Sequence, residues 1–426
     1  MRHSFFARTA AGALLALATS GCNDFLTVKN PTVIDASTVD PVQDASTFSQ
    51  SAMNNLFTAA DNVAVYQAWF TGEAWVGDTF PTRNDVSKRN IDFSNGTVSD
   101  EVWNPLAQAI ATGERTQELL ANLPDVASNI NAARAAFASG YAIQLMAETF
   151  CQSVISSSLD HLGSPLDQKA AAAEAAKRFE KVIATGTANG TAEGKSLAMA
   201  AQVGLARALL FQGNYAAAAA AADKVPASFQ FLMPRVDDPA NRGALGNTVY
   251  SFTLARPSLV VPPYYRALND PRVTSQLGGG GFPLKTQGND LSFYRQTKYV
   301  DYGDDVRLAS GLEARYIAAE ARLKAGDAAP ALALIAERAA KGSAVDGDDF
   351  ATSTNTTLVE LLDQRARDFF LEAQQMGTWF RNPDATPYVL RAGSNYYAEE
   401  GSKIGTQTCF PVPDDEVLNN PNFPKS

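Results

Sequence analysis

One pattern in this 426-residue chain restricts its fold more than any other feature. Residues 196–226 read SLAMAAQVGLARALLFQGNYAAAAAAADKVP, and apolar residues recur three and four positions apart as far as Phe211. Gly213 then interrupts the period, a run of alanines follows Tyr215, and Pro226 ends that run. Glycine just past a helical period, and proline beyond it, are stop signals for helices. The segment therefore predicts two helices joined by a tight turn, with alanines that let their axes approach closely.

The same layout occurs a second time at residues 312–342 (LEARYIAAEARLKAGDAAPALALIAERAAKG), with Gly326 in the turn position. Repeated helix pairs of this kind are typical of tetratricopeptide repeats, in which each pair buries its face against the next. We expect a further pair near residues 129–184, and the amphipathic helices that start near Asp44 and Val102 to complete the stack. The sequence predicts an all-α fold, a tetratricopeptide-repeat-like helical scaffold. A plain alanine-rich bundle is the alternative.

Long irregular insertions interrupt the helical period. Residues 228–310 are rich in proline, glycine and tyrosine and show no sustained helical pattern, and residues 72–99 form a shorter irregular loop. The last periodic segment, residues 357–379, predicts one helix that caps the stack within the C-terminal segment 357–426. We expect residues 44–426 to form a single domain, in which the insertions are loops carried by the helices.

The N-terminus has the pattern of an exported lipoprotein. A basic segment that contains Arg2 and Arg8 precedes the apolar stretch TAAGALLALATSG, which ends directly before Cys22. This stretch is shorter than the roughly 20 residues that span a membrane. Residues 1–21 are therefore predicted to be a signal peptide, Cys22 to carry the lipid anchor, and residues 22–43 to form a tether. The alternative is an ordinary secretory signal with a chance cysteine.

The charge of the chain argues against a nucleic-acid partner. The sequence has 35 Lys and Arg against 45 Asp and Glu, a formal net charge of −10 at pH 7. Removal of the leader takes away Arg2 and Arg8 and no acidic residue, so the predicted mature protein is more negative still. A nucleic-acid-binding domain normally carries an excess of positive charge. We therefore expect no nucleic acid among the partners.

Two cysteines remain in the predicted mature protein, Cys151 and Cys409. An even number of cysteines in an exported chain favours a disulfide, because that compartment permits oxidation. Such a bond would fasten the C-terminal tail to the helical body. The alternative is two separate buried thiols that act as small apolar side chains.

The sequence singles out no catalytic or metal-binding set. His161 is the one histidine of the predicted mature protein, and it lies beside Gly163, which favours a loop residue over a catalytic one. One histidine and two distant cysteines do not make a transition-metal site. Residues 301–305 (DYGDD) lack the ligand spacing of an EF-hand and are interpreted as a solvated turn, and a calcium ligand there is the alternative. We expect no metal, no cofactor and no catalytic residue.

Aromatic residues gather in or near the irregular segments and are the candidate ligand-binding residues. Rings on loops that a rigid scaffold carries provide flat apolar faces with a polar edge, which suits stacking on sugar rings or on peptide side chains. For any one ring, packing within its loop is the alternative. The candidates are Trp69, Trp75, Tyr264, Tyr265, Tyr294, Tyr299, Tyr302, Tyr396 and Tyr397.

Several motifs together resemble the starch-utilisation D (SusD/RagB-like) outer-membrane lipoproteins. Cys22 followed by NDFLTVKNP resembles their mature start, and FPVPDDEVLNNPN resembles their terminal F-P-I-P-x-x-E-x-x-x-N-P-N. The segments ARAAFASGYAIQLMAETF and DQRARDFFLEAQQMGTWFR and both repeats agree with the same family. There are departures: Gln364 and Gln375 replace a usual Glu and a usual Arg, and CQSVISSS stands where the family has G-D-x-P.

The resemblance implies a lipid-anchored, surface-exposed protein of the outer membrane, touching the membrane through Cys22 alone. Such a protein binds an oligosaccharide or another nutrient and hands it to a SusC-like TonB-dependent transporter without breaking bonds. Two other functions remain open. One is a tetratricopeptide-type envelope scaffold, and the other is an extracellular glycoside hydrolase, which needs two carboxylates roughly 5 to 9.5 Å apart in a cleft.

Overall fold

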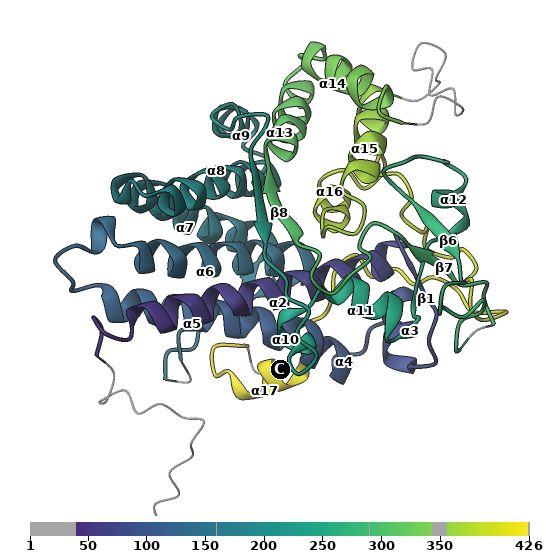
Figure 1. The fold of residues 1–426 in the computed structure, drawn as a ribbon, viewed down its shortest axis with the longest axis horizontal. Coiled ribbons are helices and arrows are strands. Elements are labelled where there is room, and N and C mark those ends of the chain that lie inside the picture. Colours follow the sequence, from purple (N-terminus) through teal and green to yellow (C-terminus); the bar gives the residue numbers. More distant parts are fainter. Residues whose placement is uncertain (1–39, 159, 289, 343–355, 425–426) are drawn as a thin grey trace, which may run out of the picture. The chain divides into compact units, whose positions relative to one another are not determined.

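The helices pack in the order in which they follow one another in the sequence (Figure 1). The structure is a computed structural model that describes residues 40–158, 160–288, 290–342 and 356–424. The predicted signal peptide, Cys22 and most of the tether lie outside the described residues. Ala45–Ser426 forms one compact unit. Its longer helices are α2 (Ala45–Thr71), α5 (Asn104–Leu120), α6 (Ile130–Thr149), α7 (Gln168–Asn189), α8 (Ala192–Gln212), α9 (Tyr215–Ala222), α13 (Gly311–Lys324), α14 (Ala329–Ala339) and α15 (Thr357–Asp368).

These helices form one continuous array. Helix α2 packs on α5 and α6, and each later helix packs on the next: α6 on α7, then α8, α9, α13, α14 and α15. Small residues permit the close approach, since a Cβ atom on Gly204 of α8 would lie 2.6 Å from the ring of Phe179 on α7. Both predicted turns form at glycines with positive φ, Gly213 (90°) and Gly326 (96°). The predicted all-α, repeat-like fold is confirmed.

The insertion at residues 228–310 leaves the helical array and returns to it at one place. Its first strand, β4 (Gln230–Met233), pairs antiparallel with its last strand, β8 (Val306–Ser310), and β8 leads directly into α13. Residues 72–99 and this insertion are more regular than predicted, because they contain short helices and two-stranded sheets. Their elements are β1 (Trp75–Val76), α3 (Pro81–Ser87), α4 (Gly96–Val98), α10 (Arg242–Leu245), α11 (Thr248–Leu254), β5 (Leu259–Val260), α12 (Pro263–Arg266), β6 (Ser275–Leu277) and β7 (Tyr294–Gln296).

The remaining short elements connect and close the array. They are η2 (Ser99–Trp103), η3 (Val126–Ser128), β2 (Gln152–Ser153), β3 (Leu166–Asp167), α16 (Gln375–Arg381) and α17 (Asp414–Asn419). Strand β2 pairs with β3, which directly precedes α7 in the sequence, and β6 pairs with β7. None of the helices in the described part of the chain is long and apolar enough to cross a membrane.

The prediction of one cap helix over residues 357–379 was wrong, because the helix breaks into α15 and α16. Leu371 and Ala373 adopt positive φ values of 59° and 54° between them. Buried side chains from elsewhere bind the freed backbone: the Leu371 amide donates to Glu73 (2.9 Å), and Arg207 donates to the carbonyl of Ala373 (2.8 Å). Periodicity predicts no such break, because the partners lie far away in sequence.

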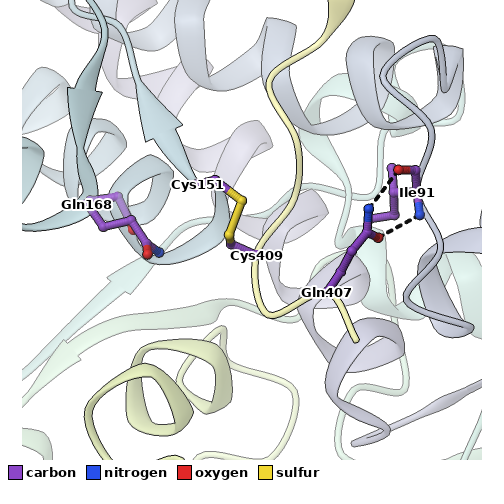
Figure 2. Close-up of a disulfide and its surroundings, with 6 residues drawn as sticks. Ile91, Cys151, Gln168, Gln407 and Cys409 are labelled. Carbon is purple, nitrogen blue, oxygen red and sulfur yellow. Dashed lines mark hydrogen bonds between the residues drawn. A yellow bond between two sulfur atoms is a disulfide. The ribbon is translucent and has the colours of Figure 1, made fainter. Parts of the chain in front are cut away.

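The C-terminal tail is fastened to the end of α6. A disulfide joins Cys151, directly after α6, to Cys409, with their Cα atoms 5.1 Å apart (Figure 2). Backbone bonds flank it, since the amide of Cys151 donates to the carbonyl of Phe410 (2.9 Å). Farther along, Gln407 accepts a hydrogen bond from the Ile91 amide (2.6 Å) and donates one to its carbonyl (2.8 Å), as Figure 2 also shows. The tail therefore docks as predicted, while oxidation in solution stays a prediction.

Candidate functional site

Five of the nine candidate rings are buried, so the expectation of exposed rings was wrong at these positions. Trp69 is fully buried on α2, where the rings of Tyr66 and Phe252 meet it edge to face. Burial of such large apolar faces drives folding, and a packed ring presents no face to a ligand. The five buried rings are Trp69, Tyr265, Tyr299, Tyr302 and Tyr396.

The other four candidates, Trp75, Tyr264, Tyr294 and Tyr397, are half-buried. Trp75 contacts both Tyr264 and Tyr397, and Tyr294 lies on β7, which a backbone hydrogen bond joins to the residue after β5. The rings of Trp75 and Tyr397 stack in parallel, with centroids 4.1 Å apart and planes 5° apart. Tyr264 meets Trp75 edge-on at 6.3 Å and lies parallel to Tyr388 at 6.3 Å. We call Trp75, Tyr264, Tyr294, Tyr388 and Tyr397 the aromatic platform. Sequence reasoning missed Tyr388, because nothing in its local sequence marks it.

Strand pairing brings together the rings of the first loop and of the insertion, and hydrogen bonds hold the C-terminal segment beside them. Trp75 on β1 pairs with Val260 on β5, and the amide of Val261 donates to the carbonyl of Tyr294 on β7 (2.8 Å). Figure 1 shows β1, α12, β6 and β7 in one region, beside part of the yellow C-terminal segment. The platform thus belongs to the insertions and the tail, which the helical array holds in place.

The hydroxyls of three platform tyrosines, Tyr264, Tyr388 and Tyr397, are bound within the protein. The hydroxyl of Tyr397 accepts a hydrogen bond from the Val76 amide (2.5 Å) and lies 2.8 Å from the hydroxyl of Ser87. The hydroxyl of Tyr264 donates to the carbonyl of Gly72. Burial raises the pKa of Tyr264 well above its usual value, so this group stays neutral. The hydroxyls fix the ring planes, and the ring faces are what the platform offers.

Arginines flank the platform. The guanidinium of Arg266, on α12, lies over the ring of Tyr294 at 3.6 Å from its centroid. Arg295, on β7, lies over Phe282 at 4.3 Å and donates to Gln276. Cations over aromatic faces are attracted by the ring quadrupole, and arginine stacks on rings more often than lysine. This edge of the platform therefore carries positive charge.

Two carboxylates beside the platform tyrosines are buried. The Glu73 side chain is 2% exposed, it accepts a hydrogen bond from the Leu371 amide (2.9 Å), and burial raises its pKa to about 8. Asp363 accepts a hydrogen bond from Tyr388 and pairs with Arg367 at 2.6 Å. Both carboxylates are therefore buried and accept hydrogen bonds from groups of the protein.

A separate cleft of about 650 Å³ lies around His161. His161 is exposed on a loop, as predicted, and its Nδ1 lies 3.4 Å from the Ser158 hydroxyl. Two of the three carboxylates that line this cleft form ion pairs, Glu114 with Arg178 at 3.0 Å and Glu118 with Arg115 at 2.9 Å, and the third, Asp160, is exposed. This cleft was not predicted, since its walls come from α5, α7, the loop that carries His161 and the C-terminal tail.

The acidic turn at residues 301–305 binds its own backbone. The Asp304 carboxylate accepts hydrogen bonds from the amides of Val300 (2.6 Å) and Asp301 (2.9 Å), and the Asp301 carboxylate accepts one from Gly303 (2.7 Å). Within the described ranges, no group of three or more His, Cys, Asp or Glu residues could hold a metal ion. The interpretation of a solvated turn agrees with this geometry.

No protein-family model and no curated protein sequence matches the chain. A solved SusD superfamily protein from Bacteroides fragilis matches it with a TM-score of 0.64 at 13% identity, over 91% of this chain and 100% of that one. The chain has the SusD fold. The predicted resemblance is thus confirmed for the fold.

Two further SusD-fold structures match equally well. A surface glycan-binding protein A from Bacteroides thetaiotaomicron, solved in complex with laminarihexaose, matches with a TM-score of 0.65 at 12% identity, over 89% of this chain and 97% of that one. A SusD/RagB family protein from the same species matches with a TM-score of 0.65 at 11% identity, over 89% of this chain and 94% of that one. The SusD fold therefore accounts for about nine-tenths of the chain, and the aromatic platform lies within it.

Proposed function

We propose that this SusD-fold protein is a lipoprotein of the outer-membrane surface that binds a glycan and hands it to a SusC-like TonB-dependent transporter, without breaking bonds. Capture is the function that the aromatic platform suits best. Delivery and anchoring rest on the sequence motifs, namely the leader that ends at Cys22 and the terminal FPVPDDEVLNNPN. Other nutrients, such as peptides, share the apolar faces that a platform of this kind recognises.

The stacked pair of Trp75 and Tyr397 carries the proposal. The two rings stack in parallel with centroids 4.1 Å apart, so each covers one face of the other and a ligand would pack on an outer face of the stack, while hydrogen bonds with Val76 and Ser87 fix the tyrosine ring before any ligand arrives. A sugar ring presents a flat C–H face that packs on such a surface, and a pre-set surface loses little conformational entropy on binding. The related fold that holds laminarihexaose is consistent with a carbohydrate ligand.

The test is calorimetric titration of the full chain, purified from membranes in detergent, against laminarihexaose and a panel of other oligosaccharides and peptides. Trp75→Ala is expected to lose at least about tenfold in affinity, because it removes the larger ring of the stack and leaves Tyr397 without the ring it packs on. Phe93→Ala is the matched control, since Phe93 is 61% exposed in the same irregular segment and belongs to no platform contact. Melting temperatures within a few degrees of wild type would show that both variants fold.

The other two functions are outcomes of the same titration. Product analysis of each mixture by chromatography distinguishes capture from hydrolysis, because a hydrolase would release shorter sugars. A scaffold protein would give no heat with any ligand of the panel. Equal affinity of the wild type and Trp75→Ala for the ligand would show that the aromatic platform is not the binding site.

A further inference from the structure

A second cleft lies next to the aromatic platform, and its walls carry positive charge. It encloses about 380 Å³. Arg89, Trp379, the segment from Val389 to Arg391 and the tail residue Thr406 are among the residues that line it. We call it the arginine cleft. Asp384 is the one acidic residue among those that line it, and it is exposed.

Arg89 is buried without a carboxylate partner. Its side chain and backbone together are 3% exposed, its guanidinium donates to the carbonyl of Leu390 and lies 5.1 Å from the centroid of Trp379, and its Nε has no hydrogen-bond partner. Burial lowers its pKa to about 10, which still leaves the group charged at neutral pH. Burying a charge without a counterion costs free energy, so this arrangement is not explained by stability.

The backbone of Arg89 is also strained. Its φ is 53°, in the left-handed region that favours glycine and that costs a residue with a side chain roughly 1 kcal/mol or more. Such strain tends to persist where function requires a side chain at a given place. Burial, strain and the missing counterion therefore point to an anion that is supplied from outside the chain.

The other arginines without a counterion lie mostly around the same region. Within residues 40–424, leaving aside those that the structure does not describe, five arginines have no carboxylate oxygen within 4 Å. They are Arg89, Arg266, Arg295, Arg365 and Arg391. Arg89 and Arg391 line the cleft, and Arg266 and Arg295 flank the platform. In a chain of net charge −10, this grouping favours an anionic ligand.

One short segment connects the cleft to the platform. Tyr388 is a platform ring, and Leu390 and Arg391, two and three residues later, line the cleft. Three residues of extended chain span at most about 10 Å. Leu390 also lies against Gly72, whose carbonyl binds the platform hydroxyl of Tyr264. A ligand of a few sugar units can therefore reach both places.

We infer that the ligand is an acidic glycan, whose sugar rings stack on the aromatic platform while a carboxylate or sulfate-ester group binds between Arg89 and Arg391. This inference rests on the proposed function and adds the substrate class. The planar guanidinium of arginine matches the two oxygens of such a group, and hydrogen bonds between charged partners are about twice as strong as neutral ones. The buried Arg89 supplies the fixed charge, and the exposed Arg391 closes the site from the solvent side.

The test compares acidic and neutral oligosaccharides of matched length on the full chain, by calorimetry at pH 7. The probes are glucuronate-containing and sulfated hexasaccharides, laminarihexaose as the neutral reference, and sodium sulfate alone. We expect the acidic sugars to bind at least about tenfold more tightly, because hydrogen bonds to charged groups contribute roughly 1.5 to 3 kcal/mol, the equivalent of about tenfold to a hundredfold. Arg89→Gln and Arg391→Gln are expected to abolish this preference.

Arg391→Gln keeps the test valid if Arg89→Gln fails to fold, because Arg391 is exposed. The matched control is Arg115→Gln, an exposed arginine on α5 that pairs with Glu118. Equal affinity for acidic and neutral sugars would overturn the inference and leave glycan capture standing. Binding of sodium sulfate without binding of either acidic sugar would also overturn it. No binding of any sugar would reject the proposed function itself.

Discussion

Removing the disulfide is expected to destabilise the protein without undocking the tail. The bond closes a loop of 258 residues between Cys151 and Cys409. In the chain-entropy model, a cross-link of that span lowers the conformational entropy of the unfolded chain by about 19 cal/mol/K. This corresponds to a stabilisation of the folded state by about 5.5 kcal/mol at 25 °C. Cys151 is exposed and Cys409 half-buried, so replacing both by serine removes little core packing. The loss of stability in the double variant therefore reports the cross-link itself.

The assay is equilibrium unfolding in guanidinium chloride of the oxidised wild type and of the Cys151→Ser/Cys409→Ser variant. We expect the free energy of unfolding to fall by roughly 3 to 5.5 kcal/mol, the upper figure being the chain-entropy value. Dithiothreitol should lower the stability of the wild type to that of the variant and leave the variant unchanged, which is the control. A variant within about 1 kcal/mol of the oxidised wild type would refute the reasoning. Hydrogen exchange should still protect Phe410, because it is fully buried and its amide donates to Thr149 (2.9 Å).

Three further predictions follow from buried groups and from the leader. The Tyr265 hydroxyl is buried without a hydrogen-bond partner, so Tyr265→Phe should leave the free energy of unfolding unchanged or raise it by up to about 1 kcal/mol. Tyr265→Ala should lower the free energy of unfolding, measured in urea, by roughly 3 to 5 kcal/mol. Since burial raises the pKa of Glu73 from 4.5 to about 8, the folded protein holds a proton there that the unfolded chain releases, and stability should fall by about 1.4 kcal/mol per pH unit across that window. Glu73→Gln should remove this fall, and an unchanged slope in urea titrations from pH 5 to 9 would contradict the assignment. Cys22→Ser should prevent lipidation, so metabolic labelling with palmitate should mark the wild type and not the variant.

Local sequence signals predicted the helical array well. Gly213 and Gly326 mark turns because a positive φ suits glycine, and the helices on either side bury alanine-rich faces at the predicted places. The broken cap helix was not predictable in this way. Leu371 and Ala373 leave the helical region because Glu73 and Arg207, far away in the chain, bind their backbone groups.

The sequence predicted that aromatic residues form the site, but not which of them do so. Aromatic residues in irregular segments indicated a platform, and Trp75 and Tyr397 do stack, yet Trp69 and Tyr265 turned inward. Periodicity does not separate the two outcomes, because loops have no regular face that points to solvent. The position of Tyr388 in the platform and the formation of the arginine cleft depend on contacts between segments that are far apart in the sequence, and no local sequence pattern predicts them.

The most direct test of the account is titration of the full chain with a panel of neutral and acidic oligosaccharides, followed by chromatography of each mixture. The account predicts saturable binding of at least one glycan, loss of that binding in Trp75→Ala but not in Phe93→Ala, and recovery of the intact sugar. Shortened sugars in the mixture, or binding that does not depend on Trp75, would contradict it.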